Sequence, residues 1–262
     1  MHLQVFHVDA FTAKVFGGNP AAVCPLTGWL DDDRLSLVAA ENNLSETAYF
    51  VPNGNHYELR WFTPRCEVKL CGHATLASAF VIMQILTSGL DSVRFETRFS
   101  GTLTVLRQGD LLAMDFPALA PWRCTSPPAE LMKGLGRPPA EIAQIEDNYF
   151  AVYASENEVK NIRPDFRLLE KLHPAAVAIT APGEGVDFIS RYFAPSYGIP
   201  EDPVTGSTHC SLAPYWGQRL GKKNLHARQV SQRGGELWCE VQGDRVIIKG
   251  NAVLTLRGEL LI

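Results

Sequence analysis

The sequence predicts an α+β protein made of two similar halves. Three observations support this: a repeated sequence pattern, a helix that is apolar all round in the first half, and strand patterns on either side of it. The repeat begins at Gly72 and Gly206, which lie 134 positions apart. Residues 60–64 match residues 191–195 at an offset of 131, so the second copy has three additional residues before its glycine. The offset of 134 also relates Gly101 to Gly235 and residues 108–110 to residues 242–244. This pattern indicates an internal duplication.

The predicted helix at residues 73–86 is apolar on nearly every side. A helix of this kind is buried all round. Strands on one face would leave the other faces uncovered, so the sheet has to curve around the helix. In the second half the equivalent helix is expected to begin at Ser207. It should end or kink at Pro214, because proline has no amide hydrogen to donate inside a helix.

The other elements follow from alternating apolar residues, turn residues and helix-capping signals. In the first half we expect a helix at 31–41, ended by Asn42 and Asn43, and strands at 3–8, 21–24, 46–51, 57–62, 93–99, 102–107 and 111–116. In the second half we expect helices at 129–135 and 165–172 and strands at 148–153, 176–180, 187–193, 236–241 and 245–249. Six prolines within residues 117–139 mark a boundary between a domain 1–117 and a domain 118–262. A last strand at 252–262 is expected to return to the first half.

The composition excludes several classes of protein. The chain of 262 residues is 46% hydrophobic and 20% charged, with a net charge of −4, which is typical of a globular protein. Basic residues are scattered, so we expect no nucleic-acid partner. No signal peptide or membrane-spanning stretch is evident, and the six cysteines show no disulfide framework. We therefore expect a cytoplasmic protein that does not bind membranes, and a homodimer is a further expectation.

The start of each buried helix is a candidate anion site. Gly72 and His73 begin one helix, and Gly206 and Ser207 begin the other. Unpaired N–H groups and the helix dipole favour an anion there, and glycine permits a close approach of the ligand. If the two helix starts face one cleft, they can hold a small carboxylate. The alternative is that the glycines only allow close packing and Ser207 only caps its helix.

Three further features are candidates for chemistry. The turn at residues 16–20 exposes backbone N–H groups, which makes Gly18 and Asn19 candidate substrate-binding residues. Glu46 and Asp202 have no clear counterparts in the opposite halves, and such broken symmetry suits a site with two different tasks. Each carboxylate also has an ordinary interpretation, as a solvated strand residue or a turn residue. A zinc site can be drawn from cysteines and histidines, but its spacing is not a standard pattern and we expect no metal; its members would be Cys66, Cys71, His73, His209 and Cys210.

Short motifs recur along the whole chain, each weak by itself: Asp9-Ala10-Phe11, Gly18-Asn19-Pro20, Asn43-Leu44-Ser45-Glu46, Phe62-Thr63-Pro64, Leu70-Cys71-Gly72-His73-Ala74-Thr75, Phe193-Ala194-Pro195 and Glu201-Asp202-Pro203-Val204-Thr205-Gly206-Ser207. As a set they resemble the PhzF-like (phenazine biosynthesis isomerase-like) proteins, within the wider diaminopimelate epimerase-like fold. The resemblance implies two domains of one fold, each a curved sheet or barrel around a central helix. It also implies an active site between the domains that needs no cofactor or metal.

The resemblance assigns roles to four residues. The catalytic Glu, His and Asp of the family fall on Glu46, His73 and Asp202, and its substrate-contacting Ser falls on Ser207. Amino-acid epimerases of the wider fold use a cysteine before the helix in both halves. Here Cys71 occupies the first position and Thr205 the second, which argues against a two-thiol racemisation.

The function expected from these residues is a cofactor-free isomerisation, in biosynthesis, of a small cyclic or amino carboxylate. Glu46 would move a proton between two carbon atoms of the substrate, and desolvation would raise its pKa toward the working pH. One alternative is an epimerase or racemase that uses Glu46 and Cys71 from opposite faces. Another is a binding or scaffold protein that kept the fold without the activity. The substrate and the pathway are left open by the sequence.

Overall fold

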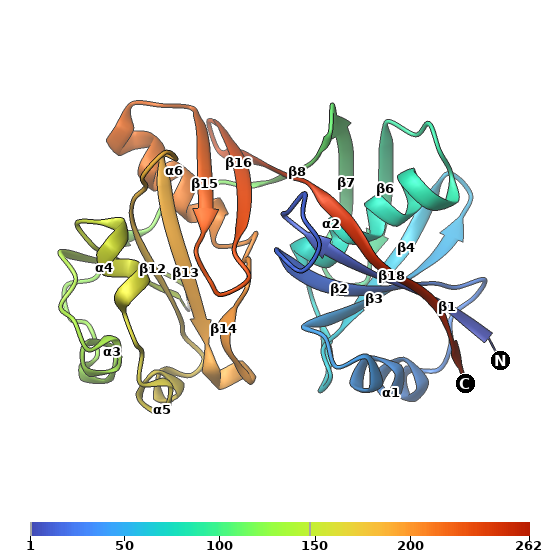
Figure 1. Cartoon of the computed structure of the whole chain (residues 1–262), viewed down its shortest axis with the longest axis horizontal. Coiled ribbons are helices and arrows are strands. Elements are labelled where there is room, and N and C mark those ends of the chain that lie inside the picture. Colours follow the sequence, from blue (N-terminus) through green and yellow to red (C-terminus); the bar gives the residue numbers. More distant parts are fainter. Residues whose placement is uncertain (1, 147) are drawn as a thin grey trace. The chain divides into compact units, whose positions relative to one another are not determined.

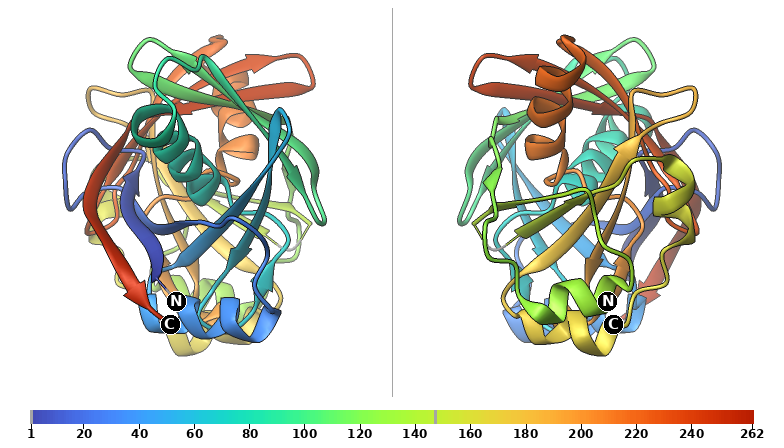
Figure 2. Two further views of the ribbon diagram at one scale, coloured as in Figure 1. Left: turned by 90° about the vertical axis from the view of Figure 1, so that its right-hand side faces the viewer. Right: turned by 90° about the vertical axis from the view of Figure 1, so that its left-hand side faces the viewer.

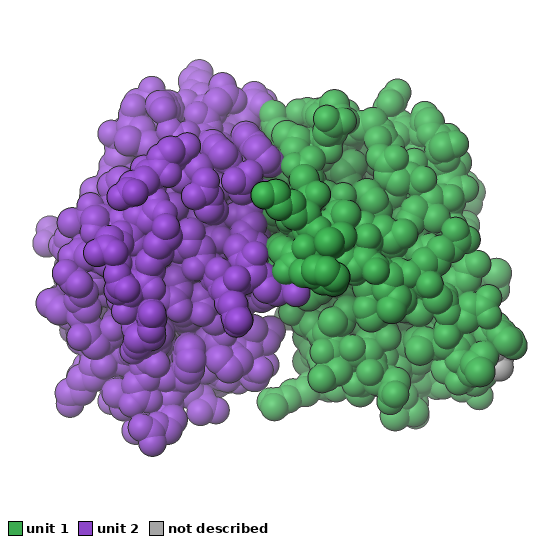
Figure 3. Space-filling model, in the orientation of Figure 1, with its two compact units in different colours: residues 1–115, 249–262 green, residues 116–248 purple. Residues whose placement is uncertain are grey.

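The structure, a computed structural model, describes residues 2–146 and 148–262. These residues form two compact units: residues 1–115 with 249–262, and residues 116–248 (Figure 3). Among the described residues, no helix is both long enough and apolar enough to cross a bilayer.

The first unit is a curved sheet with two helices. In chain order it contains β1 (His2–Ala10), β2 (Asn19–Pro25), α1 (Asp32–Asn42), β3 (Glu46–Asn53), β4 (His56–Phe62), β5 (Glu67–Val68), α2 (Gly72–Val81), the π-helical turn η1 (Ile82–Leu86), β6 (Ser92–Thr97), β7 (Gly101–Gln108), β8 (Leu111–Pro117) and β18 (Ala252–Leu261). β2 pairs antiparallel with β1 and parallel with β3. β4 lies between β3 and the parallel strand β6, and β7 and β8 continue the sheet. β18 pairs antiparallel with β1, placing His2 opposite Leu261, so both chain ends lie together (Figure 2).

The sheet wraps around α2, as predicted. Apart from Gly72 and Phe80, every residue of α2 is buried. The helix contacts strands from both ends of the sheet, among them β1, β2, β3, β7 and β18 (Figure 1). The α-helical part ends at Val81, five residues before the predicted end, and the π-helical turn continues to the exposed Leu86. The helix therefore changes its geometry where it leaves the core.

The second unit has the same plan. In chain order it contains β9 (Trp122–Arg123), α3 (Ala129–Leu135), β10 (Glu141–Ile145), β11 (Asn148–Val152), α4 (Glu156–Asn161), α5 (Phe166–Leu169), η2 (Glu170–Leu172), β12 (Ala176–Pro182), β13 (Phe188–Ala194), η3 (Pro195–Tyr197), β14 (Ile199–Asp202), α6 (His209–Leu220), β15 (Asn224–Gln229), β16 (Gly235–Gln242) and β17 (Arg245–Gly250). β11 pairs antiparallel with β10 and parallel with β12. β13 lies between β12 and the parallel strand β15, which pairs with β16. Each of these pairings has its equivalent in the first unit, which confirms the duplication.

The sequence prediction missed several elements of the second unit, chiefly β10, β14, β15 and α4. β15 alternates buried residues with exposed or half-buried ones, but its buried residues include Gln229, and its other face carries Asn224, His226 and Arg228. A strand is predicted from apolar residues at every second position. A polar residue on the buried face interrupts this pattern, so β15 was not predicted. The three additional residues of the second copy fall beside η3, between β13 and β14.

The helix α6 differs from its prediction at both ends. It begins at His209 rather than Ser207, and it continues past Pro214 to Leu220. Pro214 cannot donate to the carbonyl of Cys210, four residues earlier. That carbonyl instead accepts a hydrogen bond of 2.9 Å from the backbone N–H of Leu119. Because a partner outside the helix satisfies the carbonyl, the proline does not end the helix.

The duplication also reproduces an ion pair that the sequence analysis did not single out. Arg60 donates two hydrogen bonds to the carboxylate of Glu67, at 2.7 and 2.8 Å. Arg191 and Glu201 form the same bidentate pair, at 2.7 and 2.9 Å. Each guanidinium also lies over the phenylalanine two residues along its strand, at 5.1 and 5.0 Å from the ring centre. The pair links the strand to the segment that leads into the buried helix in both units.

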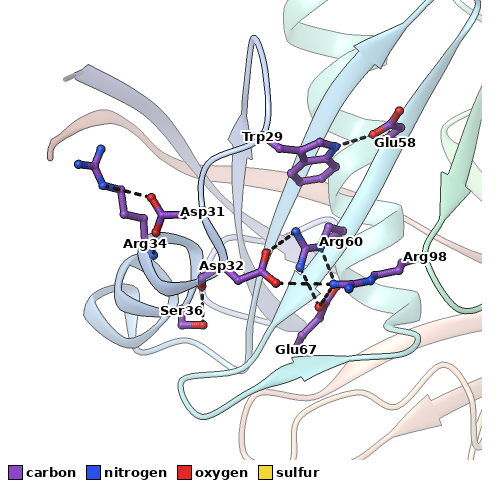
Figure 4. A network of polar contacts seen from close by, with 9 residues as sticks. All are labelled: Trp29, Asp31, Asp32, Arg34, Ser36, Glu58, Arg60, Glu67 and Arg98. Atoms are coloured by element: carbon purple, nitrogen blue, oxygen red, sulfur yellow. Dashed lines mark hydrogen bonds and ion pairs between the residues drawn. The ribbon is translucent and has the colours of Figure 1, made fainter.

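The two arginines differ in their remaining contacts. Arg191 Nη1 donates to the carbonyls of Val159 and Ile162, and is thereby covered by the α4 segment. Arg60 Nη1 donates instead to Asp32, at the start of α1 (Figure 4). A pocket of about 550 Å³ opens beside Arg60, lined also by Trp29, Glu58 and Arg98. Charged side chains of this pocket pair with one another or with Trp29, so the cluster ties α1 to the sheet.

We predict that Arg191→Met destabilises the protein by about 3 kcal/mol, because it leaves the carboxylate of Glu201 without its bidentate donor in a largely buried position. The carbonyls of Val159 and Ile162 also lose a donor. Urea unfolding measures the change.

Arg60→Met is the matched control. Its loss in free energy of unfolding should be smaller, because Asp32, which also pairs with Arg60, is 62% exposed and can be hydrated. A wild-type unfolding midpoint for Arg191→Met would contradict the structural role of the pair.

Candidate functional site

Glu46 and His73 come together in the first unit. Glu46 is the first residue of β3, and His73 lies in the first turn of α2. The wrapping of the sheet around α2 brings these two element ends side by side. His73 Nε2 lies 3.2 Å from Glu46 Oε2, with both side chains largely buried. The sequence analysis proposed both residues, and the structure shows that they are neighbours.

Cys71 extends this pair to three groups. Its Sγ lies 3.5 Å from Nδ1 of His73, on the side of the ring opposite Glu46. Burial lowers the pKa of His73 to about 3, so the imidazole is neutral at physiological pH and carries one hydrogen. Cys71 and Glu46 therefore approach different nitrogens of the ring. The 3.2 Å contact joins a neutral imidazole to a carboxylate and is not a full ion pair.

The same three residues are the metal-ligand candidates that the structure brings together. One ligand atom from each of Glu46, Cys71 and His73 lies within 4.8 Å of the others. A metal ion bound by one histidine uses one ring nitrogen, yet Cys71 and Glu46 contact opposite nitrogens. The two contacts thus lie at different ring nitrogens, which argues against one metal ion bound by all three residues. Cys66, considered with them from the sequence, is exposed and contacts Thr63.

The start of α2 offers backbone donors beside these residues. Cys71, the N-cap residue, is extended, and its side chain makes no capping hydrogen bond. The first N–H groups of a helix have no carbonyl partner within it, so Gly72 and His73 present donors at the positive end of the helix dipole. Thr75 anchors this turn through two bonds to the carbonyl of Cys71, from its N–H at 3.1 Å and its hydroxyl at 2.6 Å.

Gly18 and Asn19 are fixed by the backbone of the first unit. Gly18 has φ of +60°, and a Cβ there would lie 2.1 Å from the carbonyl oxygen of Ala10. Only glycine fits this position. Asn19 is fully buried, and it lies on β2 rather than in the predicted turn. The N–H of Phe16, one of those expected to be exposed, donates to the Asp9 carboxylate at 2.7 Å.

In the second unit, Asp202 belongs to a hydrogen-bonded loop. It ends β14, and its carboxylate accepts a short hydrogen bond from the hydroxyl of Thr205. The side chain of Gln229, which is fully buried on β15, bonds to both residues. Gly206 is buried and Ser207 exposed in the helical turn that precedes α6. The carbonyl of Ser207 accepts a hydrogen bond from the N–H of Cys210. The N-cap residue of α6 is Thr208.

The sequence analysis considered His209 only as a possible zinc ligand, and its role at the start of α6 was missed. By the offset of 134 it is the counterpart of Thr75. Its Nδ1 donates to the carbonyl of Thr205 at 2.9 Å, as the hydroxyl of Thr75 donates to that of Cys71. Burial lowers the pKa of His209 to about 4, so it too is neutral. It holds the start of its helix in the same way as Thr75.

Strand register shows that the carboxylates are not duplicated. Glu46 lies opposite Ala21 between the parallel strands β2 and β3, and the equivalent residue of β12 is Ala176. Asp202 on β14 lies opposite Tyr192. The equivalent of Tyr192 in the first unit is Trp61, which lies opposite Val68. Each unit thus carries its own acid at a different place in the shared fold.

Comparison with known proteins agrees with this fold. Residues 8–258 match the family described as phenazine biosynthesis-like protein (PhzC-PhzF). The chain belongs to the PhzF-like family. It is 52% identical to an uncharacterized isomerase of Pseudomonas aeruginosa over 260 residues, 99% of both chains. An uncharacterized isomerase of Halalkalibacterium halodurans is 44% identical over 265 residues, the whole of both chains.

Solved structures confirm the fold class. A PhzF-family crystal structure from Enterococcus faecalis has a TM-score of 0.96 and 44% identity, with complete coverage of both chains. A hydroxyproline epimerase from Agrobacterium vitis, whose structure holds trans-4-hydroxy-L-proline, has a TM-score of 0.63 at 10% identity over 99% of this chain and 92% of that one. At such low identity the likeness concerns the fold alone. The chain therefore shares its fold with this epimerase, and the predicted fold class is confirmed.

We predict that stability falls between pH 6.5 and about 4 in part because of the two buried histidines. The unfolded chain binds protons on them below pH 6.5, whereas the folded chain does so only near pH 4 for His209 and pH 3 for His73. Each histidine thus lowers the free energy of unfolding by up to about 1.4 kcal/mol per pH unit in this range.

Urea unfolding at pH 7.5 and pH 5 measures this loss, with His209→Gln as the comparison. Glutamine keeps an N–H donor for the carbonyl of Thr205 but does not titrate, so the loss should be smaller in the variant. An equal loss in both proteins would show that His209 does not contribute.

Proposed function

We propose that the protein is a cofactor-free isomerase that shifts a proton on a small cyclic or amino carboxylate. The observation that carries the proposal is the buried contact between Glu46 and the neutral His73 at the start of α2. A carboxylate is a proton carrier, and a neutral imidazole beside it can donate to it or relay its proton. The names of the similar isomerases support the reaction type.

The substrate carboxylate is proposed to bind the backbone donors at Gly72 and His73. Positive helix ends bind anions, and water-excluded donors stabilise charge that develops during the reaction. Glu46 then removes a proton from a carbon atom near the carboxylate and returns it elsewhere. General acid–base catalysis contributes about 10²–10⁴-fold, so positioning and electrostatics supply the remainder.

Asp202, Gly206 and Ser207 are proposed to act on the same substrate from the second unit. Asp202 would orient the substrate or relay the proton, and Ser207 would contact it. Gly18 and Asn19 are proposed to contact the substrate from the first unit. In the structure Gly18 permits the backbone conformation before β2, and Asn19 is the first residue of that strand. A place in biosynthesis, a homodimer and a cytoplasmic location complete the proposal.

An epimerase that uses Glu46 and Cys71 remains the second candidate. Cys71 faces Nδ1 of His73 and is buried, so its thiol serves the imidazole in this structure. Chiral analysis of the product distinguishes the two reactions, because an epimerase inverts a stereocentre and a proton shift moves a double bond. A scaffold role is less consistent with a buried acid–imidazole contact, which a binding protein would not need.

We predict that Glu46→Gln lowers the reaction rate at least ~10²-fold without unfolding the protein, since it removes the proton carrier and keeps the side-chain shape. Incorporation of solvent deuterium into a panel of cyclic and amino carboxylates, followed by NMR, measures the rate.

Glu58→Gln, another half-buried strand glutamate of the same unit, is the matched control. Near wild-type exchange by Glu46→Gln would sink the assignment of Glu46 as the proton carrier.

We predict that prolonged treatment with a strong chelator changes neither the melting temperature nor the exchange rate. Cys71 and Glu46 contact different nitrogens of His73, whereas a metal ion would use one of them. A bound metal would contribute folding energy directly, so a clear fall in melting temperature would instead identify Glu46, Cys71 and His73 as a metal centre.

A further inference from the structure

The loop that carries Asp202 is held by a buried glutamine. Gln229 Oε1 accepts from the backbone N–H of Thr205 at 2.8 Å, and Nε2 donates to the carbonyl of Asp202 at 2.8 Å. The N–H can only donate and the carbonyl can only accept, so these two contacts fix which end of the amide is oxygen and which is nitrogen. Gln229 is fully buried, and burying an amide is unfavourable unless its groups are hydrogen-bonded. Its position in the core therefore depends on this loop.

The fixed amide determines the direction of the next hydrogen bond. Gln229 Nε2 also lies 3.2 Å from Thr205 Oγ1, and the amide nitrogen is the donor. The hydroxyl of Thr205 accepts this bond and has one hydrogen of its own. That hydrogen is directed to Oδ2 of Asp202. The result is a chain of donors that starts at Gln229, passes through Thr205 and ends on the carboxylate.

This chain belongs to the second unit alone. By the repeat and the strand register, Asp202, Thr205 and Gln229 stand where the first unit has Val68, Cys71 and Thr97. Thr97 serves a different purpose, because its hydroxyl closes the turn to Gly101. The shared fold therefore does not require the three residues of the second unit. All three differ together, and together they direct hydrogen bonds to one acid.

We propose that Thr205 and Gln229 are positioning residues that hold Asp202 ionised and in one orientation for the reaction. The inference rests on the proposed function for the role of Asp202, while the hydrogen-bond chain can be tested apart from it. A donor directed at a carboxylate favours its charged form. Asp202 is then an acceptor that orients the substrate or takes up a proton, rather than an acid that supplies one.

Two titratable groups described beside Asp202 are neutral or paired. Tyr192, opposite Asp202 in the strand register, is neutral because burial raises its pKa. Glu201 is engaged by the guanidinium of Arg191. The threonine hydroxyl donates directly to the carboxylate, so its removal should change Asp202.

The test is carboxyl-carbon NMR of the full-length protein labelled with ¹³C-aspartate, with Asp202→Asn to identify the resonance. We expect Thr205→Val, which keeps the shape and removes the hydroxyl, to raise the titration midpoint of Asp202 by about one pH unit, the size of one hydrogen bond to a charged group. Thr205→Ser restores the hydroxyl and should restore the wild-type midpoint. Gln229→Met should move the midpoint in the same direction as Thr205→Val.

Deuterium exchange into the panel carboxylate that the wild type labels fastest gives a second readout. It should fall at least tenfold in Thr205→Val and recover in Thr205→Ser. An unchanged Asp202 midpoint in Thr205→Val overturns the inference, whatever the activity. A shifted midpoint with unchanged exchange also overturns it, because Asp202 is then held without serving the reaction. Failure of the proposed function appears separately, as near wild-type exchange by Glu46→Gln.

Discussion

Each unit is organised by the need to cover its central helix. A helix such as α2 has apolar residues on every side. Its apolar surface is removed from water only when strands surround it. The parallel and antiparallel pairings that run from β18 and β1 to β8 provide this cover. The wrapping has a chemical consequence, because strand ends and loops converge on the start of the helix. Glu46 meets His73 there for this reason.

The duplicated fold supplies equivalent positions, and the two units have filled them differently. The pairs Arg60–Glu67 and Arg191–Glu201 were kept in both copies, together with the side-chain bond to the carbonyl before each helix. The groups suited to chemistry were not kept. These groups and their counterparts are Glu46 and Ala176, His73 and Ser207, and Asp202 and Val68. Retained contacts maintain the fold, while the divergent residues place a different carboxylate near the start of each helix.

In both units polar side chains gather around a carboxylate near the start of the buried helix. In the first unit, burial keeps His73 neutral, and Cys71 and Glu46 contact different nitrogens of its ring. In the second unit, the hydroxyl of Thr205 donates to Asp202, and the amide of Gln229 donates to that hydroxyl. Cys71 and Thr205 are counterparts in the repeat. The same position thus carries a thiol that contacts His73 in one unit and a hydroxyl that donates to Asp202 in the other.

The sequence by itself determined the duplication, the buried helix and its surrounding sheet, and the identity of Glu46, His73 and Asp202 as candidates, because repeat offset, apolar periodicity and short motifs are local properties of the chain. It did not determine the continuation of α6 past Pro214, since that depends on the N–H of Leu119, about ninety residues earlier. Nor did it reveal Gln229, which carries no motif and acts only because β15 lies beside the loop of Asp202. Partners such as these are decided by tertiary structure, because hydrogen bonds of buried groups are satisfied by residues that are near in space and distant in sequence.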